Sequence, residues 1–380
     1  MHSPLPAASP NSPTILVVAI SGRSLATAAR RAGYRVLVAD LFNDIDTCRL
    51  AERATILPGS LHNGIDGREI VPSLRRLVGE DRPEALVYGS GFERRPEIVE
   101  MLAETFPVAG NSTDAIRRVK DPLSLASLCG EIGIPHPEIC FEAPKDRRGW
   151  LTKVPGGAGG SHVRQATSFG SSPSGSYFQR HVPGVGLSAL FLAGRGRTRV
   201  VGYSRQWSSP TATSPFRYGG AVRLPRFPRE KGEKVSGWLN DLVARTGLVG
   251  LCSADFIDGP EGTFLLEINP RPGATLDIFD GEDTPLLTQH LRAVRGESIE
   301  IPRFRGVMAS AVVYAARPIP RFPDLEWPPL TADHQRPGSA LDAGDPVCTV
   351  LAQARSAAAA ERAVKARINE LTPHWEENAG

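Results

Sequence analysis

The pattern that most constrains this chain is an apolar run, residues 264–269, that ends in an acid, an apolar residue and an amide. Side chains alternate between the two faces of a β-strand, so Glu267 and Asn269 share one face. An earlier apolar run, residues 248–257, carries Asp255. The turn-rich residues between the runs predict an antiparallel hairpin. Asp255, Glu267 and Asn269 are then expected on one face of that hairpin.

Two carboxylates and an amide oxygen are ligands that suit Mg²⁺, a hard cation that completes its octahedron with water and phosphate oxygens. We therefore predict Asp255, Glu267 and Asn269 as metal ligands. Arg271 follows Asn269 by two residues, where its guanidinium would bind a phosphate or an acyl phosphate. The prolines on either side of Arg271 indicate that the strand ends there. A solvated hairpin with a charged face would carry the same residues, so the pattern alone leaves both readings open.

A glycine-rich segment upstream is a second candidate site for an anion. It follows Lys153 and contains Gly156, Gly157, Gly159, Gly160, Ser161 and His162. Backbone N–H groups of such a loop can approach phosphate oxygens, and the preceding lysine adds a positive charge for the same anion. No Gly-Lys-Ser or Gly-Lys-Thr follows the glycines, so the segment is not a Walker A loop.

Lysine is scarce in this chain, with six lysines among 44 basic residues. A lysine kept at the entrance to a glycine loop therefore has added weight as a phosphate ligand. Lys120 is the second lysine that we single out, against the alternative of a surface charge at the end of a helix.

Five elements in this order resemble the ATP-grasp superfamily over roughly residues 14–300. In that family a first lysine precedes the central domain, a second lysine leads into a mobile glycine-rich loop, and a hinge strand holds the adenine. An acid followed by Glu-x-Asn then binds two magnesium ions. The corresponding elements here are Lys120, Lys153, residues 156–162, residues 177–182, and Asp255 with Glu267 and Asn269.

The resemblance implies an ADP-forming ligase that uses ATP and Mg²⁺ to activate a carboxylate as an acyl phosphate and to join it to an amine. Lys120 and Lys153 would bind the phosphates, Arg271 the acyl phosphate, and the glycine loop would close over the site. Lys153 and Arg271 are the expected catalytic residues.

The hinge departs from the usual pattern of the family, which often has acids that contact the adenine amino group and the ribose hydroxyls. Gln179 stands in the hinge, and Gly186 lies near the place of the ribose-binding acid. Gln179 can accept through its amide oxygen, and the backbone of Arg180 and Val182 can contact adenine. The preference for a particular nucleotide stays open.

Residues 88–93 and 177–180 carry a narrower resemblance, to the ATP-grasp proteins that accompany the methanopterin-linked and methanofuran-linked one-carbon pathways of methylotrophic bacteria. It implies that an amino acid is joined to a small cofactor precursor. Two alternatives remain, a nucleotide-binding scaffold or regulatory subunit without turnover, and a carboxylase or phosphoryl transferase with related chemistry.

Strands and helices are expected to alternate near the N-terminus, with strands at 14–20, 35–39 and 85–88 and a helix at 25–32, as in a parallel sheet covered by helices. The predicted fold class is α/β and α+β, an ATP-grasp fold with an N-terminal Rossmann-like domain and a small C-terminal closing lobe. The expected parts are a disordered tail (1–13), the pre-ATP-grasp domain (14–110), the central subdomain (111–183), the subdomain with the metal site (184–300) and the lobe (301–380).

Four further residues are predicted to contact substrates. Arg23 and Glu93 lie in loops that follow strands of the first domain, where open α/β sheets bind ligands. Arg205 and Arg217 lie in a polar and aromatic excursion at 202–220, and a long loop of this kind is often functional. The alternatives are polar residues that stabilise turns and a packed surface loop.

Net charge and cysteine spacing bear on the partners and the compartment of the protein. A net charge of +3 gives no argument for nucleic acid or a membrane surface. The five cysteines are scattered without a Cys-x-x-Cys pair, which favours buried thiols in a reducing compartment. We expect a cytoplasmic protein whose partners are small-molecule carboxylate and amine substrates, with a homo-oligomer left open.

Overall fold

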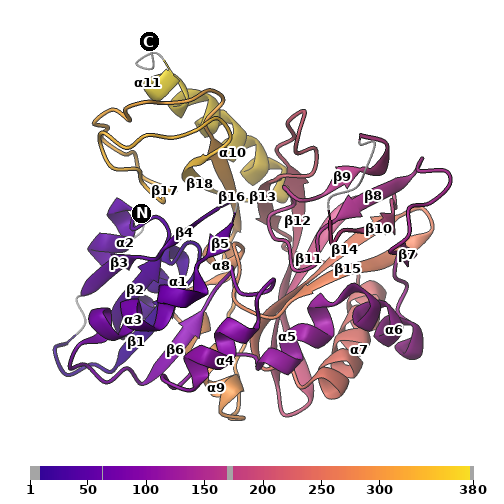
Figure 1. Cartoon of the computed structure of the whole chain (residues 1–380), viewed down its shortest axis with the longest axis horizontal. Coiled ribbons are helices and arrows are strands. Elements are labelled where there is room, and N and C mark those ends of the chain that lie inside the picture. Colours follow the sequence, from indigo (N-terminus) through magenta and orange to yellow (C-terminus); the bar gives the residue numbers. More distant parts are fainter. Residues whose placement is uncertain (1–8, 62, 169–173, 377–380) are drawn as a thin grey trace.

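The computed structural model describes residues 9–61, 63–168 and 174–376. An N-terminal α/β domain, a small central part and a C-terminal lobe surround one long sheet (Figure 1). The first eight residues of the expected tail lie outside the described residues. None of the described helices has both the length and the apolar character needed to cross a membrane.

The N-terminal domain contains a parallel sheet in the order β3-β2-β1-β6. Its strands are β1 (Thr14–Val18), β2 (Arg35–Asp40), β3 (Arg53–Ile56) and β6 (Ala85–Tyr88), and a small hairpin joins β4 (Gly59–Ser60) to β5 (Gly64–Ile65). Its helices are α1 (Arg23–Arg31), α2 (Ile45–Leu50), α3 (Gly67–Val78) and α4 (Glu97–Ala103). β1 is fully buried, as expected for a strand covered on both faces. The three predicted strands are confirmed, and the predicted helix starts two residues earlier than expected.

The central part has two helices and a four-stranded antiparallel sheet in the order β7-β10-β8-β9. Its elements are α5 (Thr113–Lys120), α6 (Pro122–Ile132), β7 (Ile139–Cys140), β8 (Trp150–Lys153), β9 (Arg164–Gln165), a 3₁₀ turn (Ala166–Ser168) and β10 (Tyr177–Arg180). Asp121 ends α5 and caps α6, where its side chain accepts a hydrogen bond from the Ser124 backbone N–H. Lys120 is therefore held at the last turn of α5 by a fixed break between two helices.

The long sheet is antiparallel throughout, with eight strands in the order β15-β14-β11-β12-β13-β16-β18-β17. The strands are β11 (Val185–Gly194), β12 (Arg197–Ser208), β13 (Tyr218–Arg223), β14 (Gly250–Gly259), β15 (Gly262–Asn269), β16 (Val307–Tyr314), β17 (Thr331–Ala332) and β18 (Pro346–Ala354). The helices of this region are α7 (Arg229–Thr246), α8 (Leu276–Phe279), α9 (Leu286–Val294), α10 (Ala357–Leu371) and α11 (Pro373–Glu376). The predicted lobe therefore adds strands to the main sheet. Its strand β16 follows the predicted boundary at residue 301 and pairs with β13, which precedes that boundary. The domain boundaries themselves stay predictions.

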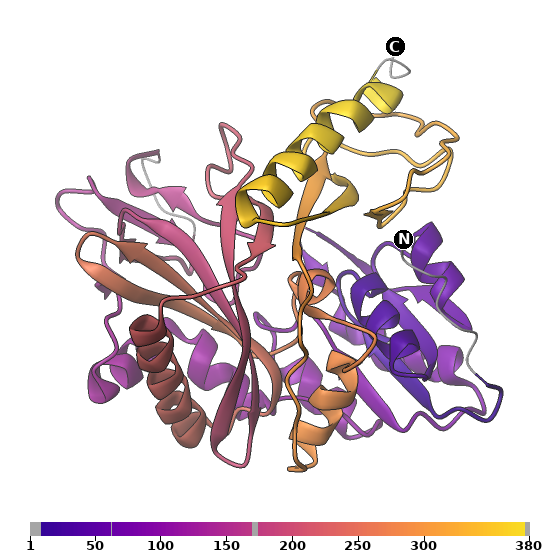
Figure 2. The same cartoon turned by 180° about the vertical axis from the view of Figure 1, so that it is seen from behind.

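Two helices cover one face of this sheet. Figure 2 shows α7 and α10 on the same side, over different strands. α7 packs on a core that includes Phe191 and Leu265, and α10 packs on one that includes Val222 and Ala309. The opposite face of β11, β12, β14 and β15 is thereby left to face the rest of the molecule.

Buried polar side chains join the N-terminal domain to the long sheet. The Asn111 amide donates to the carbonyls of Val249 (3.0 Å) and Pro270 (2.8 Å) and accepts from the Val249 N–H (2.7 Å). His290 is 1% exposed and bridges the Ala109 carbonyl and the Leu251 N–H. These contacts fix the linker after the first domain against both strands of the β14–β15 hairpin.

Replacing Asn111 by Ala should lower the free energy of unfolding by about 3 kcal/mol, because buried backbone groups would lose their partners. The measurement is urea unfolding of the variant and of the wild type. Asn63→Ala, an exposed site, is the control and should shift the midpoint little. An unchanged midpoint for Asn111→Ala would contradict this role.

Candidate active site

The predicted hairpin is present and brings its three polar side chains together. β14 and β15 pair antiparallel with Asp255 directly opposite Glu267. The Asn269 Nδ2 donates to Asp255 Oδ2 at 2.9 Å, and the Gln206 Nε2 donates to Asp255 Oδ1 at 3.2 Å. Two carboxylates therefore lie side by side on the sheet face that α7 and α10 leave open.

Lys120 supplies a positive charge to this pair of acids. Its Nζ lies 3.4 Å from Glu267 Oε2 and 3.2 Å from Asn269 Oδ1. Burial opposes ionisation of Glu267, but the charges of Lys120 and then Lys153 outweigh it and lower the pKa of Glu267 to about 2. Burial, and then the negative charge of Glu267, raise the pKa of Asp255 to about 6. Lys120 forms its ion pair with Glu267, so its charge favours the ionised form of Glu267 most strongly.

Lys153 ends β8 and points toward the same acids. It is 7% exposed, and its Nζ donates to Gln179 Oε1 at 3.2 Å. Burial lowers the pKa of Lys153, while the charges of Glu267 and Asp255 act in the opposite direction. A bound anion such as phosphate would favour the charged form of this ammonium group.

Arg271 is held by a residue of the first domain. The Arg271 Nε donates to Glu93 Oε1 at 2.8 Å, and Glu93 Oε2 accepts from the N–H groups of Gly91 (2.9 Å) and Phe92 (3.1 Å). Burial raises the pKa of Glu93, but the charges of Arg271 and Lys120 outweigh it and leave that pKa below its usual value. β15 ends at Asn269, so this ion pair rather than the strand orients Arg271.

The glycine-rich loop is packed between two other segments. A Cβ on Gly156 would lie 2.6 Å from the Glu93 carbonyl oxygen, and a Cβ on Gly160 would lie 2.0 Å from the Phe216 carbonyl oxygen. The Gly159 carbonyl also accepts from the Tyr218 N–H at 2.8 Å. Glycine is therefore required at two positions for close approach, and the loop covers the site from the first domain to β13.

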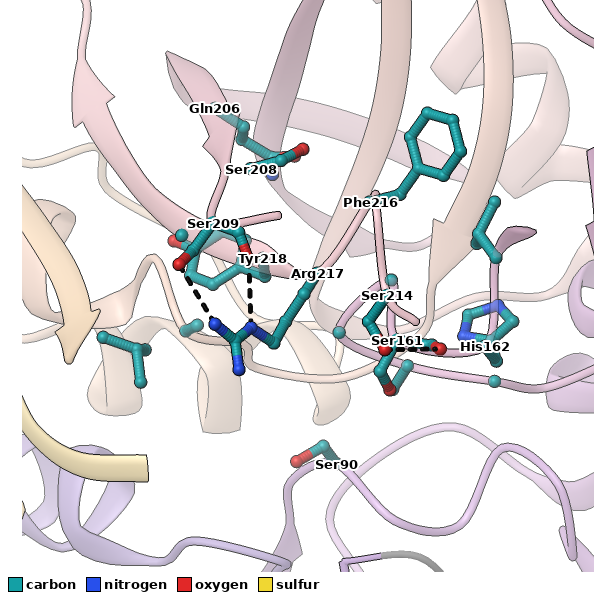
Figure 3. A pocket seen from close by; sticks show the side chains of 18 of the residues that line it. Ser90, Ser161, His162, Gln206, Ser208, Ser209, Ser214, Phe216, Arg217 and Tyr218 are labelled. Carbon is teal, nitrogen blue, oxygen red and sulfur yellow. Dashed lines mark hydrogen bonds between the residues drawn. The ribbon is translucent and has the colours of Figure 1, made fainter. Parts of the chain in front are cut away.

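The other residues of this loop lie at the site as well. Ser161 lines the cavity, and its carbonyl accepts from the Ser214 Oγ at 3.5 Å (Figure 3). The His162 ring packs on Gly157, and burial lowers its pKa to about 4, so it is neutral at physiological pH.

In the hinge, the Gln179 side chain faces Lys153, and Val182 lines the cavity. Arg180 is exposed, and its guanidinium carbon lies 5.4 Å from the centre of the Trp150 ring. Gly186, at the place of the missing ribose-binding acid, lines the cavity too. Arg180 lines the cavity as well, so the hinge meets it along residues 179–182.

Arg23 and Arg217 line the cavity but are engaged by the protein. Arg23 donates to both carboxylate oxygens of Asp277 and of Asp333. Arg217 donates to Ser209 from Nε and from Nη2, as Figure 3 shows.

The structure does not bring Arg205 to the site. Strand alternation turns Gln206 toward Asp255 and Arg205 toward the opposite face, where Arg205 pairs with Glu361 of α10 at 2.6 Å. Arg205 is not among the described residues that line the cavity. The prediction that it contacts substrate is therefore not supported.

All the other predicted site residues meet at one cavity of about 2580 Å³ or at a small pocket beside it, which Lys120 lines together with Lys153 and Glu267. This volume exceeds the range of roughly 300–1,000 Å³ that holds one small ligand. Sequence reasoning missed Gln206, Asp277 and Asp333. Arg205 and Gln206 are neighbours on one strand and so face opposite ways, which made Gln206 the alternative to Arg205 as a site residue. No local sequence pattern indicated Asp277 or Asp333.

The residues present fit a hydrated divalent cation with a phosphate. Asp255 and Glu267 present acidic oxygen atoms on one face, and burial and then the charge of Glu267 raise the pKa of Asp255, so a bound cation would favour its charged form. Lys120, Lys153 and the loop N–H groups are available to the anion. The arrangement can therefore bind a metal–phosphate complex beside a guanidinium.

Gly160→Ala should displace the glycine loop, whereas Gly159→Ala should not. Both glycines have a positive φ, 71° and 68°, so both changes cost about 1 kcal/mol of backbone strain. A Cβ at Gly160 would collide with the backbone of Phe216, whereas a Cβ at Gly159 would have no such atom within 4 Å. We expect faster amide hydrogen exchange at 154–163 in Gly160→Ala than in Gly159→Ala. Equal exchange in the two variants would contradict the packed position of the loop.

The comparison with known sequences and structures agrees with this geometry. Residues 123–275 match the family model of the ATP-grasp domain. A comparison with curated proteins finds no match.

Several solved structures share the fold at low sequence identity. The biotin carboxylase domain of 2-oxoglutarate carboxylase from Hydrogenobacter thermophilus, solved with MgADP, ADP and bicarbonate, is 15% identical with a TM-score of 0.67, and the match covers 90% of this chain and 86% of that one. L-amino acid ligase from Bacillus licheniformis is 13% identical with a TM-score of 0.68, covering 95% and 98%. N5-carboxyaminoimidazole ribonucleotide synthetase, solved with ADP, is 14% identical with a TM-score of 0.67, covering 96% and 98%. Residues 123–275 are thus an ATP-grasp domain, and the chain has the ATP-grasp fold.

Proposed function

We propose that this protein is an ADP-forming ligase that activates a carboxylate with ATP and joins it to an amine. The observation that carries the proposal is the meeting of Asp255 and Glu267 with Lys120, Lys153 and Arg271 around one cavity in an ATP-grasp domain. Two structural neighbours were solved with ADP, and a third is an L-amino acid ligase, which supports the same class of reaction.

Asp255, Glu267 and Asn269 would hold Mg²⁺, and Lys120 and Lys153 would bind the phosphates of ATP. Bound Mg²⁺ would neutralise charge on the phosphate oxygens as the phosphoryl group is transferred. Because Lys120 and Lys153 already face the acids in a buried site, little reorganisation is needed to place them on a phosphate. The hinge backbone at Arg180 and Val182 would contact the base.

The reaction has two steps. A carboxylate oxygen of the donor attacks the γ-phosphorus of ATP, the bond from that phosphorus to the bridging oxygen breaks, and ADP leaves with the electron pair. The amine nitrogen then attacks the acyl carbon, the bond from that carbon to the phosphate oxygen breaks, and phosphate leaves while the nitrogen gives up a proton. Arg271, oriented by Glu93, would hold the acyl phosphate between the two steps.

The glycine loop would keep water from this intermediate. Its contacts with Glu93 and Phe216 already close it over the site, and excluding water suppresses hydrolysis of an acyl phosphate. A more specific proposal is that the acceptor is an amino acid and that the product serves one-carbon cofactor biosynthesis.

A second candidate is a nucleotide-binding scaffold or regulatory subunit without turnover. The hinge favours it, since Gln179 and Gly186 stand where the family often has acids. The two candidates differ in whether ADP is released when donor and acceptor are supplied.

Glu267→Gln should lower ADP release roughly 100-fold or more, because the site loses one of its two acidic metal ligands. The measurement is ADP release with MgATP in a screen of carboxylates and amino acids, with thermal unfolding to check the fold. Glu261→Gln, an exposed residue in the turn of the same hairpin, should leave the rate unchanged. Full turnover by a folded Glu267→Gln variant would contradict the assignment of Glu267 to the site. If the wild type releases no ADP with any pair of carboxylate and amino acid, the scaffold without turnover is favoured.

Glu93→Gln should lower kcat about 10-fold while KM for ATP changes by less than about 3-fold, because it loosens Arg271 and leaves the phosphate ligands in place. Glu97→Gln, an exposed residue four positions later on α4, is the matched control. A variant whose KM for ATP rises while kcat is kept would show that Glu93 acts on the nucleotide instead.

A further inference from the structure

Arg23 lies between two acids that come from distant parts of the chain. It is the first residue of α1, in the N-terminal domain. Asp277 belongs to α8, which follows Arg271 in the chain, and Asp333 follows β17 in the C-terminal lobe. All three residues of this bridge line the cavity. One guanidinium therefore joins the first domain, the segment after the metal hairpin and the lobe.

The guanidinium of Arg23 has little capacity left for a ligand. Its Nη1 and Nη2 donate to the two carboxylate oxygens of Asp277 at 2.5 and 2.7 Å, and its Nε and Nη2 donate to those of Asp333 at 3.0 and 2.9 Å. These bonds use four of its five N–H groups. Burial opposes the charge of Arg23, but the two acids outweigh it and raise its pKa well above the usual value. Its contacts are thus those of a bridge within the protein.

The segment between Arg271 and Asp277 is closely packed. A Cβ on Gly273 would lie 2.5 Å from the Arg271 Nη1, so this guanidinium rests against the Gly273 backbone. The Gly273 carbonyl accepts from the Leu276 N–H at 3.0 Å, at the start of α8. Leu276 is buried in the apolar core. A displacement of Asp277 is therefore passed to the backbone on which Arg271 packs.

The N-terminal domain holds this segment at two points. Glu93 accepts from the Arg271 Nε, and Arg23 binds Asp277. The side chains of both pairs are at most 10% exposed. Water and salt screen buried pairs of this kind much less than exposed ones. Arg271 thus has one direct anchor in the first domain and a second anchor that acts through Arg23.

The lobe presents Asp333 in an uncommon backbone conformation. Asp333 has a φ of 59°, in the left-handed region that glycine, asparagine and aspartate adopt more readily than other residues. The next residue, His334, ties this turn to the N-terminal domain. Its N–H donates to Asp46 Oδ2 at 3.2 Å, and its carbonyl accepts from the Ile45 N–H at 3.1 Å. Surrounding contacts therefore impose the conformation that aims Asp333 at Arg23.

One acid would be enough to neutralise Arg23. Arg31, at the other end of α1, pairs with Asp280 and so holds α1 against the end of α8 without an acid from the lobe among the described residues. Burial opposes the charge of Asp333, but Arg23 outweighs it and leaves the pKa of Asp333 below its usual value. Charge balance does not account for the second acid at Arg23. What Asp333 adds is a connection from the lobe to the segment that carries Arg271.

We propose that Asp333 is a positioning residue for the ligase reaction, and that Arg23 and Asp277 transmit its effect to Arg271. The C-terminal lobe thereby sets the position of the guanidinium that holds the acyl phosphate. This inference rests on the proposed function. It gives Arg23 a positioning role in place of the substrate contact expected from the sequence.

Asp333→Asn tests the proposal, because asparagine removes the charge and still adopts the left-handed backbone. It should lower kcat for ADP release about 10-fold while KM for ATP changes by less than about 3-fold, since the phosphate ligands stay in place. Asp324→Asn, which changes an exposed acid of the same lobe, is the matched control and should alter neither constant. A general loss of structure would instead change KM and lower the midpoint of urea unfolding, and that result overturns the positioning role.

A double-mutant cycle tests the route through Arg23. If Asp277 and Asp333 act through the same guanidinium, Asp277→Asn combined with Asp333→Asn should lower kcat by no more than about 3-fold beyond the larger single effect. Single effects that multiply would show that the two acids act independently, and would overturn the route.

Amide hydrogen exchange separates this proposal from the proposed function, because it needs no substrate. Exchange at 270–279 should be faster in Asp333→Asn than in the wild type and unchanged in Asp324→Asn. Faster exchange in a protein that releases no ADP supports the connection from the lobe and contradicts the ligase. ADP release by the wild type with unchanged kcat in Asp333→Asn overturns the positioning role and leaves the ligase standing.

Discussion

Two carboxylates that face each other across a hairpin, Asp255 and Glu267, are the constraint on which the rest of the site depends. Half-buried acids that lie side by side repel each other, and their partial burial also disfavours their charges. The protein offsets this with Lys120 from α5 and Lys153 from β8, which lie in different parts of the chain. The central part must therefore be placed against the long sheet for the acids to be tolerated, and the same placement makes a site for a metal and phosphate.

The two faces of the long sheet carry different kinds of side chain. α7 and α10 cover one face with apolar packing, so the polar residues of β12, β14 and β15 can occupy the other. The N-terminal domain and the C-terminal lobe then meet this open face through Glu93 and through Asp333. Each added part thus contributes a charged side chain to the wall of the one cavity.

Local pattern was enough to predict the hairpin, the glycine loop and the strands of the first domain. The alternation in residues 264–269 placed Glu267 and Asn269 on one face, and the Asp255 pairing followed from the turn. The contacts of Arg23 with Asp277 and Asp333 span 254 and 310 residues, and no local pattern encodes such distances. The prediction that Arg205 contacts substrate was not supported for a different reason. The sequence does not show which face of β12 meets the site, because that depends on the neighbouring strands.

The most direct test of the account is calorimetric titration of the purified protein with a non-hydrolysable ATP analogue, with and without Mg²⁺. Because Asp255 and Glu267 are expected to act through a cation, the account predicts binding that is at least about 10-fold tighter when Mg²⁺ is present. Binding that is equally tight without Mg²⁺ would contradict the role of the two acids. No binding by the folded protein would contradict the ATP site itself.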